Sequence, residues 1–225
     1  SDDLLIGGAG ADTLAGDNGF DTVSYVSSAG GVTVDLGLGT GSGSDAQGDT
    51  YSGIEAVIGS AYIDLLTGDA AANLLDGGAG NDTLAGGLGA DTLNGGVGSD
   101  AVSYATSSAA VTVNLSTSTA TGGDAQGDTF TSIEAVIGSA QNDLLTGDGL
   151  ANSLTGGAGD DTLSGGGSAD AIIGGAGVDT ADYSTSSGSV TVNLTSGLGT
   201  GGDAQGDTLA EIENLVGSAL DDILI

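Results

Sequence analysis

The chain has 225 residues, which allows one or two ordinary domains, and it contains no Lys, Arg, His, Cys, Met, Trp or Pro. Its 31 acidic residues give a formal net charge of −31, so it cannot neutralise nucleic-acid phosphates and is repelled by an anionic membrane surface. Lack of Cys excludes disulfides and thiolate metal sites. Without His, Cys or Lys the chain has no His-based zinc site or triad and no Cys nucleophile. Paired carboxylates could in principle hydrolyse glycosides, but we expect the aspartates to be committed to turns and therefore expect no enzyme activity.

The composition also predicts a weak core. The chain has 46 glycines and only 3% aromatic residues. Ordering nine residues of backbone costs about 9–18 kcal/mol, whereas burying one Leu returns about 1.5–3 kcal/mol. Repulsion between the acidic residues opposes compaction further. We therefore expect the chain to fold poorly alone and to need a bound cation, which its side chains do not supply.

A nine-residue phrase, Gly-Gly-x-Gly-x-Asp-x-Leu-x, runs along the chain. Ser1–Ile6 matches the end of this phrase, and the clearest full copies are Gly7–Ala15, Gly77–Ala85, Gly86–Asn94, Gly95–Ser103 and Gly156–Ser164. The glycines permit positive φ and tight turns, the Asp at position six adds an anionic oxygen, and the Leu at position eight is an apolar anchor. Carbonyl and carboxylate oxygens are the ligands that Ca²⁺ selects. One such phrase would be only a turn, but many in register predict calcium sites.

These tandem phrases resemble the calcium-binding nonapeptide of the repeats-in-toxin (RTX) family. The resemblance implies an all-β fold, a right-handed parallel β-roll or β-solenoid, in which each phrase supplies a turn and a short strand. Two phrases then make one coil, and calcium lies between the turns of successive coils. Each ion takes backbone carbonyls and position-six carboxylates, and the resemblance implies roughly ten ions in all.

The residues that this resemblance assigns to calcium fall into two sets. The carboxylates at position six are Asp3, Asp12, Asp21, Asp64, Asp82, Asp91, Asp100, Asp143, Asp161, Asp170, Asp179 and Asp222, and the first glycines, which offer carbonyls, are Gly7, Gly77, Gly86, Gly95, Gly156, Gly165 and Gly174. Asn73 and Asn152 occupy position six with a neutral oxygen, which predicts weak or absent sites there. Asp64 also lies in a poorly matched turn, and Ala181 at position eight predicts a thin part of the core.

A longer repeat of 79 residues lies above the nonapeptide, and Tyr25, Tyr104 and Tyr183 mark it. The units are approximately 1–58 (incomplete), 59–137 and 138–216, with 217–225 starting another, and both chain ends suggest a segment of a longer array. A complete unit has five phrases and then a 34-residue insert. Within the inserts, Val32–Leu36, Val111–Leu115 and Val190–Leu194 alternate with period two and predict strands, as does Ile133–Ile137.

The length of the insert predicts how units stack. We expect it to supply three half-coils, which with five phrases makes a whole number of coils per unit. The three tyrosines would then lie on one face, and residues 1–225 would form a single continuous solenoid without helices. The tyrosines themselves are expected to pack in the core.

Each insert also carries two aspartates four residues apart between glycines, and these are a second candidate calcium site. The pairs are Asp45/Asp49, Asp124/Asp128 and Asp203/Asp207. The alternative is a solvated acidic turn. Glu55, Glu134 and Glu213 recur nearby, and we expect them to face solvent or else to be supplementary ligands.

The leading functional hypothesis is a calcium-dependent structural module of a secreted bacterial protein. The RTX resemblance implies type I export and folding on contact with calcium outside the cell. One alternative is a segment of an extracellular fibre, surface layer or adhesin that associates end to end. Another is a non-catalytic accessory module of a secreted polysaccharide-modifying enzyme. The expected partners are calcium and a second copy of the chain, without nucleic acid or membrane insertion, and no apolar run reaches the length of a membrane span.

Overall fold

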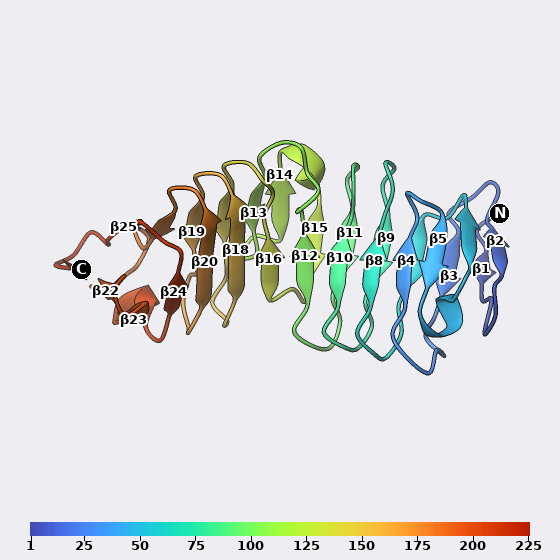
Figure 1. The fold of residues 1–225 in the computed structure, drawn as a ribbon, viewed down its shortest axis with the longest axis horizontal. Helices are drawn as coiled ribbons and strands as arrows, with labels where there is room; N and C mark the ends of the chain where they lie inside the picture. The colour runs from blue at the N-terminus through green and yellow to red at the C-terminus, as the bar shows by residue number, and fades with distance from the viewer. The chain divides into compact units, whose positions relative to one another are not determined.

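The computed structural model describes residues 1–225, and nearly all of its regular structure is short β-strands (Figure 1). There is no α-helix; three single 3-10 turns, η1 (Ser44–Ala46), η2 (Gly123–Ala125) and η3 (Gly202–Ala204), lie in the inserts. No helix is long or apolar enough to cross a membrane. Contacts divide the chain into unit 1, residues 1–103 with 124–133, and unit 2, residues 104–123 with 134–225.

Unit 1 contains strands of two sheets. In the first sheet the order is β1 (Leu4–Leu5), β3 (Thr22–Ser24), β7 (Ala56–Ile58), β9 (Leu74–Asp76), β11 (Thr92–Asn94) and β15 (Thr129–Thr131), and all of these pairs are parallel. In the second sheet the order is β2 (Thr13–Ala15), β6 (Thr50–Ser52), β5 (Thr40–Ser42), β4 (Thr33–Asp35), β8 (Leu65–Thr67), β10 (Thr83–Ala85) and β12 (Ala101–Ser103). Because successive phrases alternate between the sheets, the chain winds as a roll.

Unit 2 repeats this plan. One sheet has β14 (Thr119–Thr121), β13 (Thr112–Asn114), β17 (Leu144–Thr146), β19 (Thr162–Ser164), β21 (Thr180–Asp182) and β25 (Asn214–Val216). The other has β16 (Ala135–Ile137), β18 (Ser153–Ala158), β20 (Ala171–Ala176), β24 (Thr208–Ala210), β23 (Leu198–Thr200), β22 (Thr191–Asn193) and β26 (Ile223–Leu224). The predicted all-β roll of parallel strands is therefore confirmed, while a single solenoid over both units stays a prediction.

The core is built around a row of buried position-eight side chains from the nonapeptide strands. Leu84 and Leu163 are fully buried in the centres of β10 and β19, while their neighbours Thr83 and Thr162 point outward and are partly exposed. This alternation is the expected period of a strand. Leu84 lies in register with Leu66 of the adjacent β8, so each core residue stacks on its equivalent one coil away. Ala181 is buried at this position too, where it fills less space than the leucines.

The inserts depart from the expected winding. In unit 1, β4 turns back on itself: β5 is antiparallel to β4, and β6 is antiparallel to β5. As a result, β6 pairs with the earlier β2 and β4 pairs with the later β8, so three strands of one insert lie side by side in one sheet (Figure 1). The strands β22, β23 and β24 repeat this arrangement in unit 2. The expected strands Val32–Leu36, Val111–Leu115 and Val190–Leu194 are confirmed as β4, β13 and β22.

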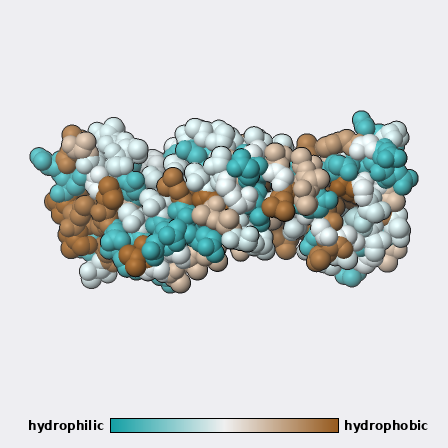
Figure 2. All heavy atoms as spheres, turned by 90° about the horizontal axis from the view of Figure 1, so that it is seen from above, coloured by the Kyte–Doolittle hydropathy of each residue, from teal (hydrophilic) through white to brown (hydrophobic).

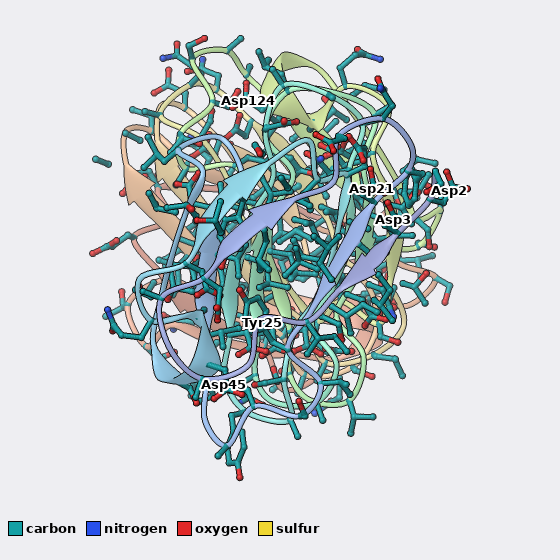
Figure 3. All side chains as sticks on the ribbon, turned by 90° about the vertical axis from the view of Figure 1, so that its right-hand side faces the viewer. Asp2, Asp3, Asp21, Tyr25, Asp45 and Asp124 are labelled. Atoms are coloured by element: carbon teal, nitrogen blue, oxygen red, sulfur yellow. The ribbon has the colours of Figure 1, made fainter.

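The expectation of three half-coils per insert is wrong for this reason. The three-stranded reversal counts as one half-coil and the strand after it as a second. Five phrases and the two half-coils of one insert therefore make an odd number of half-coils per 79-residue repeat. Strands 79 residues apart therefore fall in opposite sheets, as β3 and β12 do in unit 1 and β13 and β22 in unit 2. Tyr25 follows β3 and Tyr104 follows β12, so the strands before these two tyrosines belong to opposite sheets, against the expectation. Figure 3 likewise shows Asp45 and Asp124 at different edges of the roll.

Candidate calcium site

The aspartates at position six form a ladder that ties each coil to the next. The Oδ1 atom of Asp21 accepts the backbone N–H of Asp3 at 2.7 Å, and Figure 3 shows the two residues side by side. In the same way Asp100 accepts from the N–H of Asp82 at 2.7 Å, and Asp161 from that of Asp143 at 2.8 Å. A carboxylate that accepts a backbone N–H is fixed in position. One oxygen of each of these aspartates therefore links neighbouring coils.

The second carboxylate oxygen, Oδ2, is different in many of these turns. It is buried and has no hydrogen-bond partner in Asp12, Asp21, Asp82, Asp91, Asp161, Asp170 and Asp179. Burying an unpaired charged oxygen is strongly unfavourable. Because the chain has no basic side chain, it supplies no side-chain cation for these oxygens.

The orphaned oxygens face a cradle of other oxygens beside the first glycine of each phrase. A Cβ atom added to Gly77 would lie 2.5 Å from Asp82 Oδ2 and 2.7 Å from the carbonyl oxygen of Gly95, one coil away. At Gly156 the same atoms come from Asp161 and Gly174. No three carboxylates converge, so backbone carbonyls would supply the remaining ligands. Hard oxygens of both kinds suit calcium, and the residues present therefore fit this ion.

Glycine at positions two and four is what opens the turn. Gly78 and Gly80 have φ of 92° and 143°, values that side chains disfavour. Asp17 adopts φ of 64° at position two, which Asp tolerates better than most residues. Ser168 replaces the glycine at position four and has a φ of 91°, so that turn keeps its shape despite the substitution.

Another group of turns is closed by its own side chain. At Ser60, which replaces the second glycine, the N–H donates to Asp64 Oδ2 at 2.5 Å and the hydroxyl to Asp64 Oδ1 at 2.9 Å. Ser139 and Asp143 repeat this pair of contacts. In the turn that ends at Asn73, the side-chain oxygen accepts the N–H of Asp69 at 2.7 Å. These oxygens already have protein partners, so the turns are poor candidates for an ion.

The remaining members of the sequence-predicted set have partners of a similar kind. Asn152 Oδ1 accepts the N–H of Asp148 at 2.7 Å. Asp222 Oδ1 accepts the Ser218 hydroxyl at 2.8 Å, and Asp3 Oδ1 accepts the Ser1 hydroxyl at 2.9 Å. Apart from the open turn of Asp21, which has Asp17 at position two, a glycine at position two was the sequence signal that separates open turns from closed ones.

Burial shapes the electrostatics of the open turns. It raises the pKa of Asp82, Asp91, Asp161 and Asp170 to about 6, and neighbouring carboxylates add to the effect. The pKa of Asp179 is raised for the same reasons. Burial and neighbouring charge therefore disfavour the ionised form of these carboxylates near neutral pH, and a bound cation would stabilise it.

The insert aspartates lie elsewhere. Asp49 and Asp207 are buried; their Oδ1 atoms accept the N–H groups of Asp12 and Asp170, both at 2.9 Å. Their Oδ2 atoms accept the hydroxyls of Tyr25 at 2.6 Å and Tyr183 at 2.8 Å.

In the second insert Asp128 takes the same place, since its Oδ1 accepts the N–H of Asp91 at 2.9 Å. Asp45, Asp124 and Asp203 lie on the 3-10 turns, and Figure 3 shows Asp45 at the periphery. In the pairs Asp45/Asp49 and Asp203/Asp207, the Oδ2 atom of the second aspartate, which an ion would use, already accepts a tyrosine hydroxyl. Calcium in the inserts stays a prediction. The tyrosines are buried as expected, and the sequence did not reveal their bonds to Asp49 and Asp207.

Comparison with known families gives one result. The RTX calcium-binding nonapeptide repeat matches the chain in four copies, at residues 1–23, 49–84, 67–102 and 146–181, which together cover half of the chain. No curated protein matches it. The four matches contain all of the orphaned Asp Oδ2 atoms named above.

Proposed function

Because the chain belongs to the RTX calcium-binding nonapeptide-repeat family, we propose that it is a structural module of a secreted bacterial protein that folds when it meets calcium outside the cell. The observation that carries this proposal is the set of buried, unpartnered Oδ2 atoms in a chain without Lys, Arg or His. We infer further that the module is not catalytic, since its position-six carboxylates are committed to turns and it has no His, Cys or Lys.

The free energy available from calcium is large enough for this role. A site whose dissociation constant is tenfold below the calcium concentration adds about 1.4 kcal/mol to stability, so seven open turns add about 10 kcal/mol. This lies within the net stability of ordinary domains, about 5–15 kcal/mol. Extracellular calcium modules have dissociation constants of about 0.1–1 mM. Sites of that affinity fill outside the cell and stay empty at the far lower calcium level of the cytosol.

The test is circular dichroism of the chain in chelator and in millimolar calcium. We expect a disordered spectrum in chelator and a β-rich spectrum in calcium. Magnesium at the same concentration should not replace calcium, because it demands small octahedral sites and gives up its waters reluctantly. An identical spectrum and melting temperature with and without chelator would overturn the proposal.

Self-association end to end is a second candidate. Figure 2 shows hydrophobic residues reaching the surface in patches, and Leu38 and Val97 are 77% and 74% exposed. Exposed apolar patches favour contact with another chain. Sedimentation in calcium distinguishes the candidates: a mass that grows with protein concentration supports association, and a constant monomer mass contradicts it.

A further inference from the structure

The inserts rejoin the roll through a turn that is unlike a nonapeptide. Only Gly53, Ile54 and Glu55 separate β6 from β7, where a phrase uses six residues. In unit 2, Glu211, Ile212 and Glu213 separate β24 from β25 in the same way. The isoleucine of each turn is buried, so the turn is anchored to the core.

The glutamate of this short turn takes the place of the aspartate at position six. Glu55 Oε2 accepts the N–H of Asp21 at 2.8 Å, and Glu213 Oε2 accepts that of Asp179 at 2.9 Å. The corresponding bond between two phrases, from Asp82 N–H to Asp100 Oδ1, is 2.7 Å. The extra methylene of Glu lets a shorter turn reach the same N–H group.

The short turn also presents a carbonyl at the place where a phrase presents its first glycine. A Cβ atom added to Gly16 would contact the Gly53 carbonyl oxygen and lie 2.7 Å from Asp21 Oδ2. At Gly174 the same atom would contact the Glu211 carbonyl oxygen and lie 2.6 Å from Asp179 Oδ2.

This is the oxygen pair found at Gly77 between two full phrases. Gly53 and Glu211 have φ of 59° and 54°, so the first residue of each turn lies in the left-handed region of backbone conformation. Such a conformation is unusual for Glu.

The independent observation is the aspartate opposite each turn. Asp21 and Asp179 are fully buried, and their Oδ2 atoms have no hydrogen-bond partner.

We propose that each of these junctions is a calcium site made of unlike halves. One half is a nonapeptide turn, which contributes Asp21 or Asp179, and the other is the short glutamate turn, which contributes the Gly53 carbonyl with Glu55, or the Glu211 carbonyl with Glu213. The calcium row then continues across the point where an insert joins the roll. This inference rests on the proposed calcium-dependent function and adds ligands outside the nonapeptide.

The test uses the double variant Glu55→Gln/Glu213→Gln in the full chain. Gln keeps an oxygen for the N–H groups of Asp21 and Asp179 but removes the charge, so a purely structural role is preserved and an ion-binding role is weakened. The matched control is Asp35→Asn/Asp182→Asn, which removes the same charge from side chains that are not among the proposed ligands. Asp35 Oδ1 accepts the N–H of Leu38 at 2.7 Å, and the equivalent positions 114 and 193 already hold Asn.

Calcium bound per chain, by calorimetry, and the calcium midpoint of folding, by circular dichroism, are the readouts. We expect the glutamine variant to bind one ion fewer per altered junction and to need more calcium, while the control binds as many ions as the parent. Equal ion counts in variant and control would overturn the junction sites. If the parent itself binds no calcium, the proposed function fails instead. Should the double variant not fold, Glu213→Gln, an exposed side chain, is compared with Asp182→Asn in the same assays.

Discussion

Asp82→Asn separates the two roles of a position-six carboxylate. Asp82 Oδ1 accepts the N–H of Asp64 at 2.8 Å, and Asn keeps this bond. Its Oδ2 faces the carbonyl oxygen of Gly95 in the cradle at Gly77. The amide NH₂ of Asn can donate to that carbonyl, so the variant satisfies the cradle without an ion but cannot hold calcium as a carboxylate does.

The expected effect therefore changes with calcium. With calcium at about ten times the dissociation constant, loss of one site removes about 1.4 kcal/mol of stability and raises the calcium midpoint of folding. In chelator the variant should be no less stable than the parent, because a buried, unpaired charge has been removed.

The comparison is Asp64→Asn, in a turn that is closed by Ser60. There Asn would place an NH₂ group against the Ser60 N–H, which costs about 1–3 kcal/mol whether or not calcium is present. Urea unfolding followed by circular dichroism at several calcium concentrations measures both variants. The reasoning is refuted if the loss at Asp82 does not grow with calcium, or if the two variants respond to calcium alike.

Three further outcomes test other parts of the structure. In chelator, the folded fraction should rise as the pH is lowered from 7 to 5. The pKa of Asp82 and Asp91 is about 6 in the folded chain and about 3.9 in the unfolded chain, so the stability from their protonation is present at low pH and is lost as the pH rises through 6. A circular dichroism spectrum that does not change over this range would contradict the prediction. Tyr25→Phe removes the hydroxyl that Asp49 Oδ2 accepts and should cost about 1–3 kcal/mol at every calcium concentration, so an unchanged urea midpoint would count against it. Ser60→Gly should open its turn and add one bound ion in calorimetry; an unaltered count would show that position two does not control the site.

Much of the roll was predictable because its local rules repeat. The period-two alternation put Leu84 inward and Thr83 outward, and the phrase placed Asp82 in a turn. The closed turns at Asn73 and Asp64 were also visible as departures from the phrase. Each of these features depends on residues within one phrase, so sequence spacing alone carries them.

The features that escaped prediction depend on pairing over longer separations. Period-two alternation identifies a strand such as β4 but does not say whether its neighbour is parallel or antiparallel, so the reversal through β5 was missed. The bond from Tyr25 to Asp49 joins residues 24 apart across the insert. The link between Glu55 and Asp21 spans 34 residues and was visible only as a recurring Glu.

The odd number of half-coils in each 79-residue repeat has a consequence for stability. An insert adds two strands to one sheet, about 10 Å along the stacking direction, and none to the other. In unit 1 the strands β4, β5 and β6 lie in one sheet and β15, from the next insert, in the other, so successive inserts lengthen alternate sheets. Deleting Gly86–Asn94, one phrase, would place the first and second inserts on the same sheet. Deleting Gly77–Asn94, two phrases, would keep them on opposite sheets. We expect the shorter deletion to have the higher calcium midpoint and the lower melting temperature, although it removes less of the core. Stability that falls steadily with the number of residues deleted would show that the alternation of inserts does not matter.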